Sequence, residues 1–256
     1  MGFEFMTNGN PENSLEWIVF LAAKYSKMFL EGTKLTLFIA VAGTVLGFIA
    51  GYLVGIIQDT KVNQGDHIVK RCLFWLLKVL STIYVEVFRD TPMIVQAMII
   101  YYGLRQTGLN MTPVFAGILV TVLNTGAYMA ETVRGGIGSI DIGQREGAWA
   151  MGMSPLKTMF YVVLPQAFKN IIPEMANTFL TNLKMTSVLN VIAVQELFMA
   201  AKTVGGNYYK YFESYLVIAI IYFVLCFVFN KLFIFMEKKL KGRKDYALAV
   251  EYMDNQ

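Results

Sequence analysis

The sequence predicts an all-α membrane protein with about five transmembrane helices, and three observations support this fold class. Hydrophobic residues make up 56% of the 256-residue chain and charged residues 16%, whereas soluble domains average roughly 50% and 25%. The segments Leu35–Gln58 and Gln106–Ala130 contain no charged residue, and each exceeds the ~20 residues that a helix needs to cross the hydrocarbon core. Basic residues also gather in alternate loops, a pattern typical of multi-spanning proteins.

The expected spans follow from the apolar stretches and from the polar segments that separate them. The second span is centred on Pro92 to Leu104 and is expected to begin earlier, near Leu73. The chain then divides into an N-terminal extracellular or interfacial segment (1–30), a transmembrane domain (31–236) and a cytoplasmic tail (237–256). The other expected spans are Thr36–Ile57, Pro113–Val133, Ile172–Val194 and Tyr215–Phe235.

The basic residues predict the orientation of these spans. They fall in the loop after the first span, in the loop after the third span and in the C-terminal tail. Because basic loops usually lie in the cytoplasm, the N-terminus is expected outside and the C-terminus inside. The residues are Lys61, Lys70 and Arg71; Arg145, Lys157 and Lys169; and Lys238, Lys239, Lys241, Arg243 and Lys244.

The segment Leu15–Leu30 is apolar but carries Glu16, Lys24 and Lys27. Such a segment fits a helix that lies on the outer membrane surface. It equally fits an extension of the first span, and the sequence leaves both interpretations open.

Glycines recur at every fourth position of the first span, which places them along one helix face. Glycine lets another helix backbone approach closely in lipid. The stripe therefore predicts close helix packing, either within the chain or at an interface between subunits. The glycines are Gly43, Gly47, Gly51 and Gly55.

Several classes of site lack support in this sequence. Cys72 and Cys226 have no CxxC neighbour, so a metal or redox site is not expected and packing is the better interpretation. The basic tail has no accompanying aromatic or groove-reading motif, so nucleic-acid binding is not expected. The chain also contains no Gly-x-x-x-x-Gly-Lys-Ser/Thr loop that would hold the phosphates of ATP.

The loop at about 139–165, between the third and fourth spans, has the residues of two short helices. Asp141 with Gln144 fits a helix-start capping pair. Gly152 suits the left-handed position that ends a helix, and Ser154 followed by Pro155 suits the start of the next one. The sequence thus predicts a compact helix-turn-helix on the cytoplasmic surface, a structure suited to docking on a partner.

This loop resembles the signature loop of the permeases of binding-protein-dependent ABC importers. That signature contains Glu-Ala-Ala, then Gly, then Ile-x-Leu-Pro at fixed spacing. The chain departs from it at Gly147, where Ala is usual, and at Val162, where Ile is usual. The matching positions, which the resemblance assigns to coupling with an ATPase, are Glu146, Ala148, Gly152, Leu164 and Pro165.

Further segments resemble the polar amino acid permeases within that family. They cover Phe88–Pro92, with Asp90 in place of the usual Gly, and Asn124–Gly136 of the third span. Lys184–Ser187 resembles their Lys-Asp-Thr-Ser segment, with Met185 in place of the acid. The resemblance extends over nearly the whole chain after about Leu30.

The resemblance implies a transport subunit of a bacterial inner membrane that has no ATPase site of its own. Two permease subunits, alike or different, would form the pathway. A dimer of ABC ATPase subunits would bind below and carry ATP and Mg²⁺, and an extracellular solute-binding protein would deliver the substrate. The family therefore implies no cofactor in this chain.

Polar residues in the expected spans suggest a substrate site for polar amino acids. An amino acid needs donors for its carboxylate and acceptors for its ammonium group, and an amide or hydroxyl group supplies either. Asn124 and Tyr128 in the third span, with Met185 and Ser187 in the fourth, are the candidate substrate-binding residues. Hydrogen bonds between helices are the alternative role for any one of the polar members.

The missing acid at Met185 bears on the substrate. A neutral side chain there favours glutamine-, glutamate- or cystine-like substrates over cationic ones, because a cation would leave water without a partner.

Three other classes of membrane protein fit the sequence less well. The sequence has no recognisable filter of an ion channel and no nucleophile or zinc motif of a membrane enzyme. A secondary transporter for small polar solutes would usually have internal repeats and more spans.

The predicted topology can be tested by cysteine labelling in a chain that lacks Cys72 and Cys226. Asn10→Cys should react with an impermeant reagent added outside, and Asn255→Cys should not, because the charge pattern puts the two ends on opposite sides. The reverse labelling would overturn the five-span arrangement.

Overall fold

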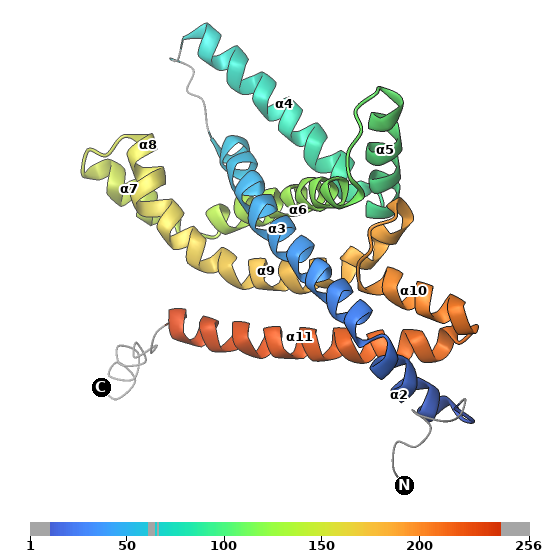
Figure 1. Cartoon of the computed structure of the whole chain (residues 1–256). Coiled ribbons are helices and arrows are strands. Elements are labelled where there is room, and N and C mark those ends of the chain that lie inside the picture. The colour runs from blue at the N-terminus through green and yellow to red at the C-terminus, as the bar shows by residue number, and fades with distance from the viewer. Residues whose placement is uncertain (1–10, 61–64, 66, 242–256) are drawn as a thin grey trace, which may run out of the picture.

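The computed structural model describes residues 11–60, 65 and 67–241, and within these ranges every regular element is helical. The labelled positions Asn10 and Asn255 lie outside the described residues. The helices form a splayed bundle, with α11 along one side and α4 projecting from the other (Figure 1). In chain order they are α2 (Ser14–Lys24), α3 (Ser26–Asp59), α4 (Ile68–Asp90), α5 (Met93–Gln106), α6 (Pro113–Gly138), α7 (Ile142–Ala150), α8 (Pro155–Thr158), the π-helical turn η1 (Met159–Val163), α9 (Leu164–Met185), the 3-10 turn η2 (Thr186–Ile192), α10 (Leu197–Tyr208) and α11 (Tyr211–Lys241).

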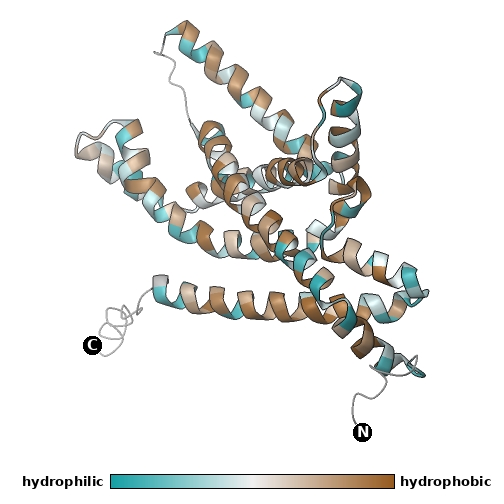
Figure 2. Cartoon of the chain, in the orientation of Figure 1, coloured by the Kyte–Doolittle hydropathy of each residue, from teal (hydrophilic) through white to brown (hydrophobic). Residues whose placement is uncertain are grey.

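Among the described residues, three helices are long and apolar enough to cross a membrane: α3, α6 and α11. A fourth candidate is the segment Pro155–Ile192 together with α10, which is bent away from it by 55°. These elements contain the expected first, third, fourth and fifth spans. Hydropathy colouring shows α3 and α11 apolar along most of their length, whereas α4 alternates between polar and apolar turns (Figure 2).

The expected second span differs from the structure, because it is divided into α4 and α5. Helix α4 ends at Asp90 and α5 begins at Met93, so the break falls at Thr91 and Pro92. Proline has no backbone N–H and disfavours helical geometry in the residue before it, which explains the break. Helix α5 has only 14 residues, and neither piece qualifies alone as a span, so a total of five stays a prediction.

The N-terminal segment is divided between two helices, and its position relative to the membrane surface stays a prediction. Its first part, α2, is a separate helix, and the chain turns at Tyr25 before α3 begins. Trp17 and Leu21 of α2 are buried against residues of α10 and α11. The ring of Trp17 lies 5.5 Å from that of Tyr208, between ring centres. The residues from Ser26 onward extend the long helix α3.

The glycine stripe packs within the chain. All of its glycines are buried on α3 and face α6. A Cβ atom at Gly51 would lie 2.6 Å from the carbonyl oxygen of Gly126 and 2.8 Å from the amide nitrogen of Ala130. Because these are backbone atoms, no side-chain rotation could make room. The pairs along the contact are Gly43 with Thr121, Gly47 with Thr125, Gly51 with Met129 and Gly55 with Val133.

A polar clamp joins the same two helices to α9. The side chain of Asn182 is buried, and its Nδ2 donates to Thr44 Oγ1 of α3 and to Thr125 Oγ1 of α6, both at 2.9 Å. Such bonds between spanning helices are each worth about 0.6–2 kcal/mol. Asn182 therefore fixes the depth of α9 against the pair formed by α3 and α6.

The close contact predicts a strong response to one methyl group. Gly51→Ala should destabilise the protein by roughly 1–3 kcal/mol, because the helices must separate to accept the Cβ atom. The melting temperature of the purified protein in detergent measures this effect.

Gly103→Ala is the matched control, since a Cβ atom there meets nothing within 4 Å. It should leave the melting temperature unchanged or raise it, because alanine is favoured over glycine in a helix by about 1 kcal/mol. Equal melting of the two variants would refute the tight contact.

Candidate functional site

A cavity of about 380 Å³ lies between α6 and α9. Most of its lining residues are of polar types, and both helices belong to candidate membrane spans. An exposed polar group is costly in lipid, so these side chains indicate a surface that faces water or a partner. The lining residues are Asn124, Thr125, Tyr128, Met129 and Thr132 of α6, and Glu174, Thr178, Thr181, Asn182 and Met185 of α9.

The structure brings together three of the four candidate substrate residues. Asn124, Tyr128 and Met185 all line the cavity. Ser187 does not, since it lies in η2 after the end of α9. Its hydroxyl donates to the carbonyl oxygen of Lys184 at 2.8 Å, which is a local contact within the chain.

Asn124 also has the alternative role that the sequence left open, because it forms hydrogen bonds to other helices. Its Nδ2 donates to the carbonyl oxygen of Phe88 and to Oε1 of Gln96, both at 3.1 Å. Gln96 in turn donates to the carbonyl oxygens of Phe88 and Thr91, both at 2.9 Å. These bonds satisfy the last carbonyl groups of α4, which have no partner inside the helix. The break between α4 and α5 is thus held in place by polar side chains.

Sequence reasoning missed Glu174, Thr178 and Thr181 of α9. Together with Met185 they are spaced by four, three and four residues, the spacing of a single helix face. That spacing was the signal that could have identified them. Glu174 accepts a long hydrogen bond from Asn177, at 3.5 Å, and supplies the only carboxylate among the residues that line this cavity.

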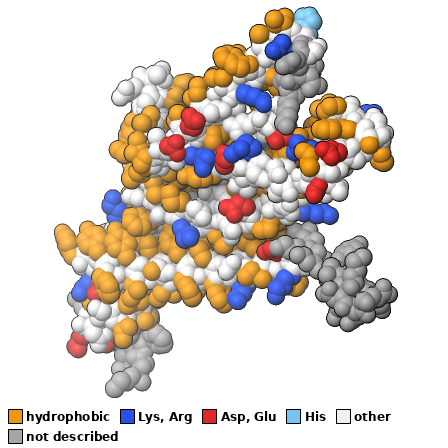
Figure 3. Space-filling view, turned by 180° about the vertical axis from the view of Figure 1, so that it is seen from behind, with side chains coloured by type: hydrophobic (Ala, Val, Ile, Leu, Met, Phe, Trp, Pro, Cys, Tyr) orange, Lys and Arg blue, Asp and Glu red, His pale blue; other side chains and the backbone are white. Residues whose placement is uncertain are grey.

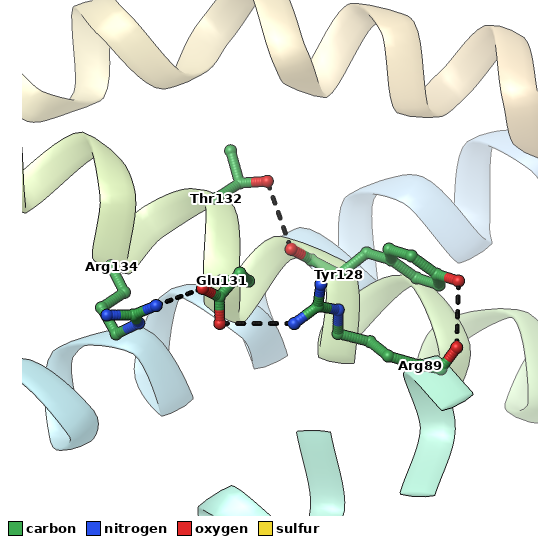
Figure 4. A network of polar contacts seen from close by, with 5 residues as sticks. All are labelled: Arg89, Tyr128, Glu131, Thr132 and Arg134. Atoms are coloured by element: carbon green, nitrogen blue, oxygen red, sulfur yellow. Dashed lines mark hydrogen bonds and ion pairs between the residues drawn. The ribbon is translucent and has the colours of Figure 1, made fainter. Parts of the chain in front are cut away.

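An ion-pair network lies beside Tyr128, which lines the cavity (Figure 4). The carboxylate of Glu131 contacts Arg134 and also Arg89 of α4, whose Nη1 lies 3.5 Å from Oε2. The guanidinium carbon of Arg89 lies 5.8 Å from the centre of the Tyr128 ring. The Tyr128 hydroxyl donates to the carbonyl oxygen of Arg89 at 3.3 Å. Tyr128 therefore separates the network from the cavity.

The loop between α6 and α9 has the local structure that the sequence predicts. Asp141 caps α7 by accepting a hydrogen bond from the Gly143 amide at 2.6 Å, and Gly152 has a φ of +80°. Ser154 caps α8, which begins at Pro155. Gln144 does not complete the capping pair, because its Oε1 instead accepts from Gln166 Nε2 at 3.4 Å.

The five signature positions divide into two groups. Ala148 and Leu164 are buried, and Leu164 lies in a cluster with Val133 and Ile137 of α6. Glu146, Gly152 and Pro165 are exposed. The buried pair thus attaches the loop to the bundle, and the exposed residues remain available to a partner.

The loop is also attached to the end of α3. Arg145 of α7 lies 3.7 Å from Asp59, between Nη2 and Oδ2, and donates to the carbonyl oxygen of Ile137 at 3.3 Å. The ends of α3 and α6 therefore lie on the same side as the loop. Large apolar side chains are exposed on this side as well: Trp149, Met151 and Leu156.

Comparison with known proteins identifies the family of this chain. Residues 70–242 match the family model described as binding-protein-dependent transport system inner membrane component. The arginine transport system permease protein ArtQ of Bacillus subtilis (strain 168) is 34% identical over 214 residues, covering 83% of this chain and 92% of the relative. The glutamine transport system permease protein GlnP of Escherichia coli (strain K12) is 31% identical over 216 residues, covering 84% and 93%.

A solved structure agrees with these relatives. The crystal structure of an amino acid ABC transporter with histidines superposes with a TM-score of 0.77 and 33% identity, covering 90% of this chain and all of that one. The chain belongs to the binding-protein-dependent transport system inner membrane component family and is a permease of the bacterial amino acid ABC transporters.

Proposed function

We propose that the chain forms the substrate pathway of an ATP-driven importer for polar amino acids. It would act as a dimer with a like or different permease chain, and an extracellular solute-binding protein would deliver the substrate. ATP and Mg²⁺ would bind to a separate dimer of ATPase subunits. The observation that carries the proposal is the polar cavity between two membrane-depth helices, α6 and α9.

The cavity offers groups for both ends of an amino acid. The carboxylate of Glu174 can accept from the ammonium group, and the hydroxyls of Thr178 and Thr181 can donate to the carboxylate. A charged substrate group loses its hydration on leaving water and needs such partners. Most of the remaining surface is apolar, which suits the methylene groups of the substrate side chain.

Met185 supports a neutral or acidic substrate. It lines the cavity, in the position where the amino acid permeases that this chain resembles carry an acid. Glu131, the other acid near this site, is engaged by Arg89 and Arg134. Glu174 remains for the ammonium group that every amino acid carries, so a second positive charge on the substrate would lack a partner.

The preference can be measured by competition during uptake by the complete complex. Glutamine, glutamate or cystine should compete better than arginine or lysine for the transported label. Met185→Asp should shift the preference toward arginine by roughly tenfold, the effect of one partly exposed charge pair worth about 1.4 kcal/mol.

Met175→Asp provides the control for added charge, since Met175 lies on α9 but lines a different pocket. It should leave the preference unchanged. Best uptake of arginine or lysine by the unaltered chain would refute the proposed role of Met185 and leave the importer assignment standing.

We propose that the α7–α8 loop docks into a groove of the ATPase, as helices do in many protein partnerships. Gly152→Val should uncouple ATP hydrolysis from uptake, because a β-branched residue resists the φ of +80° that ends α7. ATP hydrolysis and uptake should both be measured for the same purified complex.

Gly147→Ala is the control for this variant, since a Cβ atom at Gly147 meets nothing within 4 Å and alanine is the residue usual in the resembled signature. Its coupling should equal that of the unaltered complex. Normal uptake by Gly152→Val at normal expression would remove the loop from the mechanism.

A further inference from the structure

A second polar pocket, of about 360 Å³, lies between α4, α6 and the end of α3. We call it the basic pocket, and its charged members are Lys78, Glu86, Arg89, Glu131 and Arg134. Charged side chains of both signs form a band across the middle of the face seen in Figure 3. Three cations and two carboxylates leave this pocket with one excess positive charge.

The two arginines of the basic pocket share one carboxylate as their ion-pair partner. That carboxylate belongs to Glu131. The contact with Arg89 is long, at 3.5 Å, and a guanidinium group has five N–H donors. Within the described residues, Lys78 and Glu86 take part in no ion pair. The pocket therefore has donor capacity for another anion.

The basic pocket is open to a ligand. The side chains of Arg89 and Glu131 are 38% and 35% exposed, and that of Arg134 is 51% exposed. A guanidinium group binds a carboxylate through two parallel hydrogen bonds, which makes such a pair more specific than a contact with lysine. The class of ligand that fits is a carboxylate.

The position of the basic pocket relates it to the cavity between α6 and α9. Tyr128 lines that cavity, and Arg89 of the basic pocket lies against its ring. Gln58, from the last turn of α3, also lines the basic pocket. The next residue, Asp59, pairs with Arg145 of α7, so this end of α3 lies on the loop side of the bundle. The basic pocket is thus next to the cavity, toward the α7–α8 loop.

We propose that the basic pocket is a second binding site on the transport pathway, where it binds the carboxylate of an amino acid on the loop side of the cavity. We call this site the second station. This inference rests on the proposed function. The incoming carboxylate replaces Glu131 as the partner of Arg89, while Glu131 keeps Arg134. The exchange replaces one carboxylate partner of Arg89 by another, so the net gain is small and binding is weak enough to allow release.

The test uses the complete complex in right-side-out proteoliposomes that contain ATP and have the solute-binding protein outside. Initial uptake of the labelled amino acid is measured with L-glutamine, L-glutaminamide or inorganic phosphate inside. Luminal glutamine should inhibit uptake by occupying the second station. Glutaminamide, which lacks the carboxylate, and phosphate at equal concentration should not.

Two variants move the inhibition in opposite directions. Arg89→Met should weaken inhibition by luminal glutamine about tenfold, the effect of one lost charge-assisted hydrogen bond. Glu131→Gln should strengthen it by a similar factor, because the competing carboxylate is gone. A misfolded chain cannot produce this gain. Arg105→Met, at the end of α5, is the control and should not change the inhibition.

The outcomes separate the station from a purely structural network. Equal inhibition by glutamine and glutaminamide, unchanged inhibition in Arg89→Met, or weaker inhibition in Glu131→Gln would each overturn the proposal. Uptake that is insensitive to luminal glutamine would refute the station and leave the importer intact. Absence of ATP-dependent uptake by the unaltered complex would refute the proposed function and this inference with it.

Discussion

The close approach of α3 and α6 is the constraint on which the rest of this structure depends. In lipid, helices are held together by packing and hydrogen bonds, since the hydrocarbon tails are as apolar as the side chains. The glycines of α3 let its backbone approach that of α6, so that a Cβ atom at Gly47, Gly51 or Gly55 would lie within 3.2 Å of a carbonyl oxygen of α6. This contact fixes α6 at the centre of the bundle, and the remaining faces of α6 position α4, α9 and the loop.

The polar side chains at membrane depth then divide into two groups by their partners. Asn182 joins three helices, and Asn124 with Gln96 satisfies the end of α4. These groups stabilise the fold. Glu174, Thr178 and Thr181 face the cavity between α6 and α9, so they are the groups left to meet a substrate. The same residue types therefore serve structure or transport according to which helix face carries them.

Local chemistry was predictable from the sequence, and long-range placement was less so. The cap at Asp141, the left-handed Gly152 and the start at Pro155 depend on neighbouring residues only, and all three are confirmed. Ser187 was placed with Met185 because the two are close in sequence, but the change from α9 to η2 turns it away. Arg89 was noted only as part of a motif, because its contact with Glu131 joins residues far apart in the chain. Whether the cavity residues bind a substrate stays a prediction.

The pair of Asp59 with Arg145 has a mechanical consequence. It links α7 to the last residue of α3, while the glycine contact leaves α3 no slack against α6. Direct contacts thus connect α7 to α3, α3 to α6, and α6 to the cavity that it lines. A displacement of α7 would reach the cavity through two long helices rather than through the loop alone.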